Sequence, residues 1–234
     1  MTKTKKSYDS LPIQWLETTD STNSDVRRGL DTLANLSVIA ARFQTAGRGQ
    51  GSHTWLSPRD ENLTFSILFR FGKDAIPEFP ASEAVRITQV ATLAVHDFLL
   101  SEGVESRIKW PNDIWVGERK ICGMLIENIL DGALVRSSIV GIGINLNQDS
   151  FDPSLPNPVS LSMLTGRHYP LENTLILLYK KICRRVALLG TSDGYNELEM
   201  DFNRYLFHLE RSRQEALSEA IEGFEAIRQP LQDL

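Results

Sequence analysis

Hydrophobic residues recur along the chain with two different spacings, which predict helices in some segments and strands in others. The clearest helix is expected over residues 81–102, where apolar residues three and four positions apart form one stripe. Further helices are expected at 171–189 and near 195–209. An earlier helix should follow the capping residues of Asp20-Ser21-Thr22-Asn23 and end at about residue 33.

Short runs of apolar and β-branched residues predict the strands. They lie at residues 13–17, 37–43, 63–71, 107–109, 114–116, 119–129 and 134–146. Gly117 is placed to supply the positive φ of a type II′ turn in a tight hairpin. Strands that follow one another through tight turns favour a mixed sheet with helices packed mainly on one face. The predicted fold class is therefore α+β rather than doubly wound.

Composition limits the function classes. With 41% hydrophobic and 24% charged residues, the chain has the balance of an ordinary globular protein. A net charge of −5 argues against a broad nucleic-acid-binding surface, and the basic cluster Lys3, Lys5 and Lys6 is interpreted as a solvated tail. No apolar run has the length of a membrane span. Cys122 and Cys183 match neither a metal motif nor a redox pair, so reduced thiols and a cytoplasmic location are expected.

The first segment that indicates chemistry is a glycine-rich loop from Gln44 to about residue 58. Gly47 and Gly49 let backbone N–H groups converge on an anion, and Arg48 between them adds a positive charge. Trp55 adds a ring for stacking on a base or ligand. The loop matches neither the P-loop nor the dinucleotide-binding pattern. A mobile surface loop is the alternative interpretation.

The second segment holds two lysines. Lys109 and Lys120 are expected on neighbouring strands with Asp113 between them, an arrangement that suits a carboxylate or phosphate ligand. The alternative is an exposed edge strand whose lysines oppose aggregation. Strand alternation places Lys120 on the mostly apolar face of Cys122 and Met124, which favours a pocket.

The third segment is an apolar strand that contains Gly141 and Gly143. Glycines weaken a strand unless another group must approach its backbone closely. Close approach of a ligand and tight packing between strand and helix both explain them.

Together these segments resemble the biotin–protein ligase family. Five motifs stand in the family's order over roughly residues 15–150: Asp20–Asn23, Gln44–Gly49 with Trp55, Lys109–Asp113, Lys120–Glu127 and Gly141–Asn145. The resemblance implies a catalytic fold like that of class II aminoacyl-tRNA synthetases. It also implies that biotin is activated with ATP and Mg²⁺ to an adenylate and then transferred to a lysine of a biotin carboxyl carrier domain.

The resemblance also implies roles for individual residues. Those expected to bind biotin are Ser21, Thr22, Asn23, Gln44, Gly47, Arg48, Lys120 and Gly123. Those expected to bind ATP or the adenylate are Arg48, Gly49, Gln50, Trp55, Lys109, Asn112, Asp113 and Asn145. Lys120 and Arg48 would be catalytic, and Asp113 would lie near the metal-bound phosphates.

The chain departs from the family pattern in three places. Gln50 and His53 stand where further arginines are common, so activity is expected but control over adenylate release is an open point. No helix-turn-helix module precedes residue 13, so DNA binding is not expected. In place of the family's small β-barrel, residues 210–234 are helix-like. We therefore predict a catalytic domain at 1–190 and a short or truncated C-terminal region at 191–234.

Two other functions compete with biotin ligation. A lipoate or octanoate transferase shares the general fold, but the Lys109–Asp113 string fits biotin better. A biotin-binding or partner-binding protein without turnover would have no need of Arg48, Asp113 and Lys120. A homodimer is implied by the resemblance alone, and no membrane partner is expected.

Overall fold

The computed structural model describes residues 11–51, 53–73 and 75–207, and a seven-stranded mixed sheet forms its centre. The strands are β1 (Ile13–Leu16), β2 (Val38–Ala41), β3 (Leu63–Arg70), β4 (Arg107–Lys109), β5 (Asp113–Val116), β6 (Arg119–Asp131) and β7 (Leu134–Ile144). Their order across the sheet is β1-β2-β3-β7-β6-β5-β4. β1 and β2 pair in parallel, and the other neighbours pair antiparallel. The α+β prediction is confirmed.

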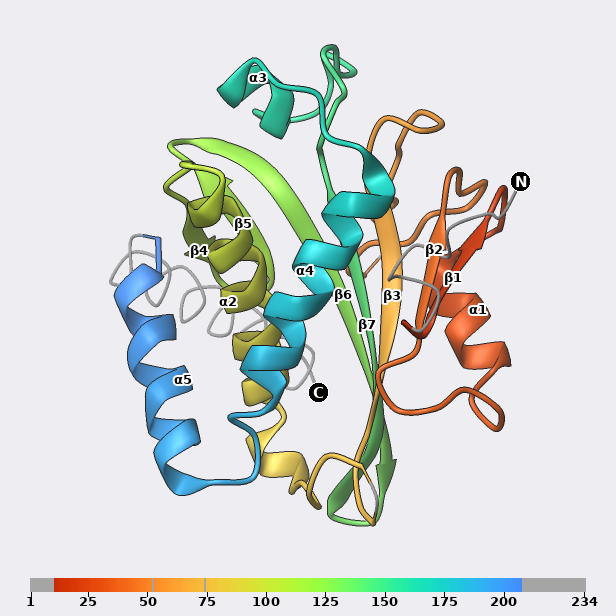
Figure 1. The fold of residues 1–234 in the computed structure, drawn as a ribbon, viewed down its shortest axis with the longest axis vertical. Helices are drawn as coiled ribbons and strands as arrows, with labels where there is room; N and C mark the ends of the chain where they lie inside the picture. Colours follow the sequence, from red (N-terminus) through yellow and green to blue (C-terminus); the bar gives the residue numbers. More distant parts are fainter. Residues whose placement is uncertain (1–10, 52, 74, 208–234) are drawn as a thin grey trace, which may run out of the picture.

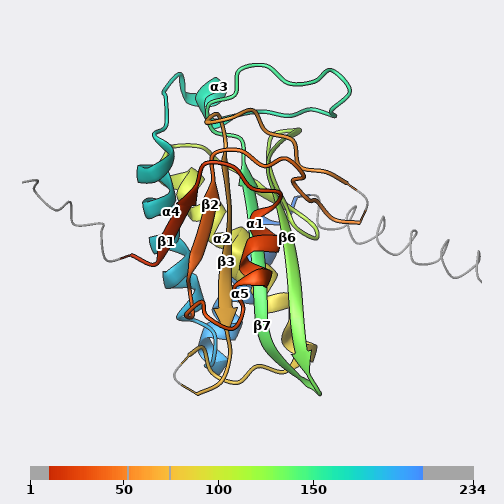
Figure 2. The same ribbon diagram turned by 90° about the vertical axis from the view of Figure 1, so that its right-hand side faces the viewer.

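The helices lie unevenly on the two faces of this sheet. They are α1 (Thr22–Arg28), α2 (Val85–Ser101), α3 (Leu161–Thr165), α4 (Leu171–Val186) and α5 (Ser192–Tyr205), with a 3₁₀ turn at Ala81–Glu83. α2, α4 and α5 lie together on one side of the sheet, and α1 lies on the opposite side (Figures 1 and 2). The prediction of helices mainly on one face is confirmed.

Helix ends differ from the expected ones for local reasons. The helix predicted to reach residue 33 ends at Arg28, because the chain turns at the C-cap residue Gly29. The last helix begins earlier than predicted because the Thr191 side chain accepts a hydrogen bond from the Gly194 N–H and caps it.

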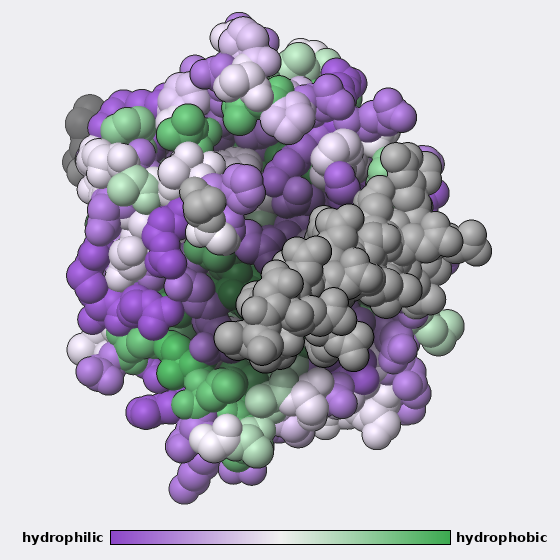
Figure 3. Space-filling view, turned by 180° about the vertical axis from the view of Figure 1, so that it is seen from behind, coloured by the Kyte–Doolittle hydropathy of each residue, from purple (hydrophilic) through white to green (hydrophobic). Residues whose placement is uncertain are grey.

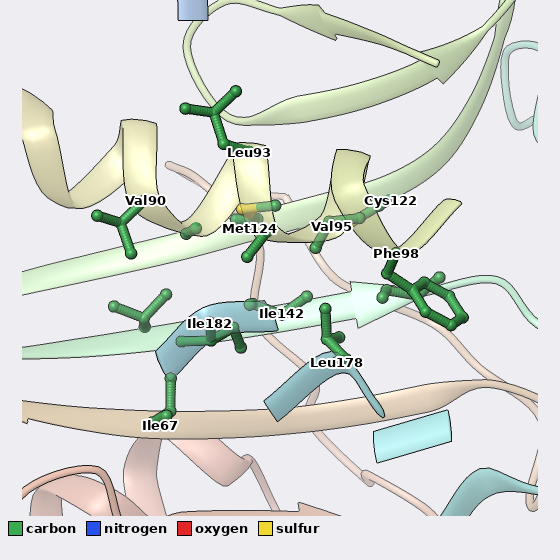
Figure 4. Close-up of a cluster of buried hydrophobic side chains, with 14 of the residues drawn as sticks. Ile67, Val90, Leu93, Val95, Phe98, Cys122, Met124, Ile142, Leu178 and Ile182 are labelled. Carbon is green, nitrogen blue, oxygen red and sulfur yellow. The ribbon is translucent and has the colours of Figure 1, made fainter. Parts of the chain in front are cut away.

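The main core lies between the sheet and the three-helix layer. Figure 4 shows α2 side chains such as Val90 and Phe98, and α4 side chains such as Leu178, turned toward the strands. A second, smaller cluster under α1 contains Val26, Ile39, Leu68 and Ile139. Because α1 is short, α1 and this cluster cover only part of their face of the sheet. The rest of that sheet face is available for a ligand site.

Several expectations from composition can be compared with the described residues. Gly117 adopts φ 56° in the β5–β6 hairpin, as the turn prediction requires. Cys122 and Cys183 are both free thiols, and burial raises the pKa of Cys122. Within the described part of the chain, no helix is long and apolar enough to cross a membrane. The lysine cluster at 3–6 and the helix-like segment at 210–234 lie outside the described residues.

Candidate functional site

A cavity of about 650 Å³ lies on the face of the sheet that carries α1. Seen from behind the view of Figure 1, the surface has a hollow that hydrophilic residues border above and hydrophobic residues border below (Figure 3). Most of the residues predicted to bind ligand line this one cavity: Ser21, Thr22, Asn23, Gln44, Arg48, Gly49, Gln50, Trp55, Lys109, Asn112, Asp113, Lys120, Gly123 and Asn145. Gly47 is the one predicted residue that does not. The fold therefore collects segments far apart in the chain at one place.

The start of α1 forms a polar end of the cavity. Ser21 is the N-cap residue, and Ser21, Thr22 and Asn23 are all buried. The Gln44 Oε1 atom accepts from the Thr22 N–H at 2.8 Å and from the Thr22 hydroxyl at 3.2 Å. Ser66 Oγ on β3 lies 2.8 Å from Thr22 Oγ1 and 2.6 Å from Asn23 Oδ1. These contacts fix several donors and acceptors for a polar ligand.

The glycine-rich loop is closed by its own backbone hydrogen bonds. The Trp55 N–H donates to Gly47 O at 3.0 Å, and the Gly49 N–H donates to His53 O at 2.8 Å. A Cβ added at Gly47 would lie well under 3.0 Å from the Trp55 carbonyl oxygen. Gly47 is thus required by the closure of the loop, which explains why it does not face the cavity. Arg48 lies between Gly47 and Gly49, the two residues that form these hydrogen bonds.

The glycines of β7 make room for side chains of this protein. A Cβ at Gly141 would lie well under 3.0 Å from the Asn23 side chain, and one at Gly143 equally close to the Trp55 ring. Of the two explanations, packing by the protein's own residues is the one observed: α1 fills the space at Gly141, and the glycine-rich loop fills the space at Gly143. The buried Nε1 of Trp55 has no hydrogen-bond partner within the described structure.

Lys120 reaches the cavity through a β-bulge, which corrects the prediction from strand alternation. Ile114 pairs with Cys122, but Trp115 pairs with Lys120, so Ile121 is one extra residue on β6. Bulges of this kind re-aim side chains next to functional sites. Lys120 thereby leaves the face of Cys122 and lies beside Gly123, whose added Cβ would be 3.2 Å from the lysine Nζ.

The two predicted lysines are not on neighbouring strands, which is a second correction. Lys109 is on β4, Lys120 is on β6, and β5 lies between them in the sheet. Asp113, at the start of β5, pairs in register with Lys109 and with Gly123. The Lys120 Nζ forms an ion pair with Asp113 Oδ2 at 2.8 Å.

The β4–β5 end of the cavity holds the remaining predicted nucleotide residues. The Asn112 side-chain amide donates to the Met124 carbonyl. Asn145 is buried, and its amide donates to Val159 O at 3.1 Å. Lys109 Nζ lies 4.3 Å from the centroid of the Trp115 ring.

Several residues at the site were not predicted, and three of them make contacts that matter for its polar groups. Trp115 lines the cavity, Ser66 supports Asn23, and Glu127 accepts hydrogen bonds from Asn23 and Arg48. A serine inside the apolar strand 63–71 was a usable signal for Ser66. Glu127 is the last residue of the Lys120–Glu127 motif. Its hydrogen-bond partners are distant in sequence, so no local sequence pattern reveals them.

The cavity is electrostatically positive. Arg48, Lys109 and Lys120 line it, and Asp113 is the only carboxylate among the described residues that line it. Among the described residues, no group of three or more His, Cys, Asp or Glu side chains could hold a metal ion. Three cations and one carboxylate suit a ligand with several negative charges.

Known proteins resemble this chain in both sequence and fold. Residues 15–145 match the model of the Biotin/lipoate A/B protein ligase family. A biotin–acetyl-CoA-carboxylase ligase of Paracoccus denitrificans is 34% identical over 183 residues, which cover 75% of this chain and 73% of that protein. A biotin protein ligase of Aquifex aeolicus, solved in complex with biotin and ATP, superposes with a TM-score of 0.70 at 25% identity. That match covers 84% of this chain and 78% of the other.

A longer relative shares only part of its length with this chain. The bifunctional ligase/repressor BirA of Bacillus spizizenii is 37% identical over 148 residues, which are 62% of this chain but 44% of that protein. The chain therefore spans less than half of that relative. Because the family model matches more than half of the chain and the Paracoccus relative is covered over most of its length, the chain belongs to the biotin/lipoate A/B protein ligase family.

Proposed function

We propose that this chain is a biotin protein ligase that uses ATP to form biotinyl-5′-AMP and then transfers biotin to a lysine of a carrier domain. One observation carries the proposal. A single cavity joins a buried polar end, at the start of α1, to a positively charged end at β4 and β5, and Lys120 lies between them. Such a site suits a substrate whose polar rings bind at one end and whose carboxylate reacts with a nucleotide bound at the other end. The relatives reported above are biotin ligases, so lipoate transfer is not favoured.

The register of the sheet orders the two ends. Asn23 packs against Gly141, Trp55 packs against Gly143, and Asn145 follows two residues further along the chain. Residues two apart in a strand are about 6.5 Å apart along its axis. We assign Ser21, Thr22, Asn23 and Gln44 to the biotin rings and Lys109, Asn112, Trp55 and Asn145 to the nucleotide side.

In the first step, a biotin carboxylate oxygen attacks the α-phosphorus of ATP, the bond to pyrophosphate breaks, and pyrophosphate leaves. Two anions must meet, so positioning and charge stabilisation are the main tasks of the protein. The Lys120 ammonium is well placed for this because its three donors can serve both reacting groups. Its present partner Asp113, at 2.8 Å, holds it in the cavity until a substrate anion takes part of that role. Arg48 would supply the second charge.

Mg²⁺ would enter this site with the phosphates of ATP. Magnesium commonly uses one or two protein carboxylates together with substrate phosphates. In the part of the chain that the structure describes, Asp113 is the one carboxylate that lines the cavity. Bound there, the ion would neutralise charge on the leaving pyrophosphate. We propose Asp113 as its protein contact.

In the second step, a lysine amine of the acceptor attacks the acyl carbon of the mixed anhydride, and AMP leaves. The glycine-rich loop, closed by its own hydrogen bonds, borders the cavity and would shield the anhydride from water. The Paracoccus relative is named for acetyl-CoA carboxylase, so we propose the biotin carboxyl carrier domain of such a carboxylase as the acceptor.

The proposal is tested by incubating the chain with biotin, ATP, Mg²⁺ and a carrier domain, followed by mass spectrometry of the carrier. We expect a biotinyl mass addition that requires ATP and is lost in Lys120→Ala. Lys180→Ala, which removes an exposed lysine on α4, is the matched control and should label normally. ATP-dependent labelling at an unchanged rate in Lys120→Ala would remove Lys120 from the mechanism, and no labelling by the wild type would refute ligase activity.

A further inference from the structure

Glu127 on β6 joins the polar end of the site to the glycine-rich loop, although it is not among the described residues that line the cavity. Its Oε2 accepts from the Asn23 amide at 2.9 Å, and its Oε1 accepts from Arg48 Nη2 at 3.0 Å. Arg27 on α1 adds a third contact, at 3.2 Å from Oε1. One carboxylate, with only 17% of its side chain exposed, is therefore shared by the polar end, the glycine-rich loop and the outer side of α1.

This contact determines where Arg48 points. Arg48 is 45% exposed on a loop, and a free arginine side chain has many rotamers to lose when it meets a ligand. Contacts of both terminal nitrogens with Glu127, at 3.0 and 3.4 Å, hold the guanidinium plane in one orientation. It is the only arginine between residues 44 and 58, so no other arginine in the loop can substitute for it.

The same carboxylate fixes the Asn23 amide. Asn23 Nδ2 donates to Glu127 and, at 3.3 Å, to the Leu125 carbonyl, while Asn23 Oδ1 lies 2.6 Å from Ser66 Oγ. Without the Glu127 side chain, the amide would keep only the contacts to Ser66 and Leu125. The orientation of Asn23 and the position of Arg48 are thus linked through one side chain.

The electrostatics allow Glu127 to hold Arg48 without cancelling its charge. Burial would raise the pKa of Glu127, but the hydrogen bonds from Asn23 and Arg48 and the charges of Arg48 and Arg27 outweigh burial and lower it. The carboxylate is therefore ionised at neutral pH. Because Arg27 compensates the same negative charge from outside the cavity, Arg48 keeps positive charge available for a ligand anion.

We propose that Glu127 is a positioning residue that couples binding at the polar end of the cavity to placement of Arg48 over the reacting anions. This inference rests on the proposed function. It assigns Glu127 no contact with substrate, since its effect passes through Asn23 and Arg48. Loss of its charge should therefore change both substrate binding and turnover, whereas a merely structural role would reduce only the amount of active protein.

The first test is kinetic and compares Glu127→Gln with Glu102→Gln. Glu102 is a matched control because its carboxylate also pairs with an arginine, Arg167 at 2.8 Å, and its side chain is 18% exposed. For Glu127→Gln we expect the KM for biotin to rise and kcat for adenylate formation to fall, each by about tenfold, as loss of charged hydrogen bonds implies. Glu127→Asp, which keeps the charge, should recover part of both. Unchanged KM and kcat in Glu127→Gln would overturn the proposal while leaving the ligase function intact.

The second test needs no activity and separates the two hypotheses. Limited trypsin digestion of the ligand-free chain is followed by mass spectrometry for cleavage after Arg48. Freed from Glu127, Arg48 should be cut several-fold faster in Glu127→Gln than in the wild type or in Glu102→Gln. Equal cleavage rates would overturn the positioning role even if the wild type proved inactive. Thermal melts show whether each variant folds. If Glu127→Gln does not fold, Glu127→Asp, whose shorter side chain moves the carboxylate away from Arg48 and Asn23, replaces it in both tests, and a smaller change in the same direction is expected.

Discussion

At the scale of single residues, absent side chains shape this site as much as present ones. Gly141 and Gly143 leave space on β7 that the Asn23 amide and the Trp55 ring occupy. The two glycines lie two positions apart, so they face the same side of the sheet. The strand backbone thereby becomes a floor on which α1 and the glycine-rich loop place side chains for a ligand.

Adding a methyl group at either glycine should damage binding in a position-specific way. In Gly141→Ala the new Cβ would lie well under 3.0 Å from Asn23, and in Gly143→Ala equally close to Trp55, so a side chain or the strand must move. Overpacking costs about 1–3 kcal/mol, which corresponds to roughly 5- to 150-fold in an equilibrium constant. Titration calorimetry with biotin alone should show at least a fivefold weaker Kd for Gly141→Ala. Arg136→Ala, on an exposed position of the same strand, should bind normally, and an unchanged Kd in Gly141→Ala would exclude the proposed role of Asn23.

At the scale of elements, hydrophobic periodicity predicted the presence of helices and strands better than it predicted their ends. All seven strands and the four longer helices were predicted, because their apolar spacing reflects a core between sheet and helices. The positions of the helix ends depend on single contacts such as the Thr191 cap. The bulge at Ile121 was not predictable, since alternation assumes an unbroken strand, and it decides on which face Lys120 lies. The Arg48–Glu127 pair joins segments 79 residues apart, so only the folded chain brings it together.

A largely buried arginine on α4 contacts carboxylates on two other helices of the layer, which gives a stability prediction. Arg185 on α4 is 12% exposed and contacts Asp97 on α2 at 2.8 Å and Asp201 on α5 at 2.6 Å. Arg185→Met would leave these two carboxylates without their shared cation. Because the two carboxylates are 25% and 30% exposed, water replaces part of the lost contact, and we expect a loss of about 1–3 kcal/mol in the free energy of unfolding, below that of a fully buried pair. Guanidinium denaturation should show that loss as a lower midpoint, whereas Arg184→Met at the exposed neighbouring position should unfold like the wild type. Equal midpoints would mean that the other contacts of α5, including the hydrogen bond from Arg86 to the Tyr195 carbonyl, hold it without Arg185.

At the scale of the whole molecule, the charge at the cavity is opposite in sign to the net charge of the chain. The chain carries a net charge of −5, yet its cavity is lined by three cations and one carboxylate. The three cations at the cavity can attract a polyanion such as ATP although the chain as a whole is negative. That contrast could not be predicted from composition, because net charge does not report where the charges gather.

This distribution predicts different salt dependences for the two substrates. ATP carries several negative charges and biotin carries one, so screening should weaken the attraction of the cavity for ATP more strongly. Raising NaCl from about 50 to about 300 mM shortens the Debye length to less than half. We expect the KM for ATP to rise several-fold over this range and the KM for biotin to change much less. In Lys109→Gln the rise for ATP should be less steep, because one of the three cations is gone, while Lys180→Gln on the outer face of α4 should behave as the wild type. Equal salt dependence for both substrates, or an unchanged slope in Lys109→Gln, would show that the positive end of the cavity does not receive the phosphates.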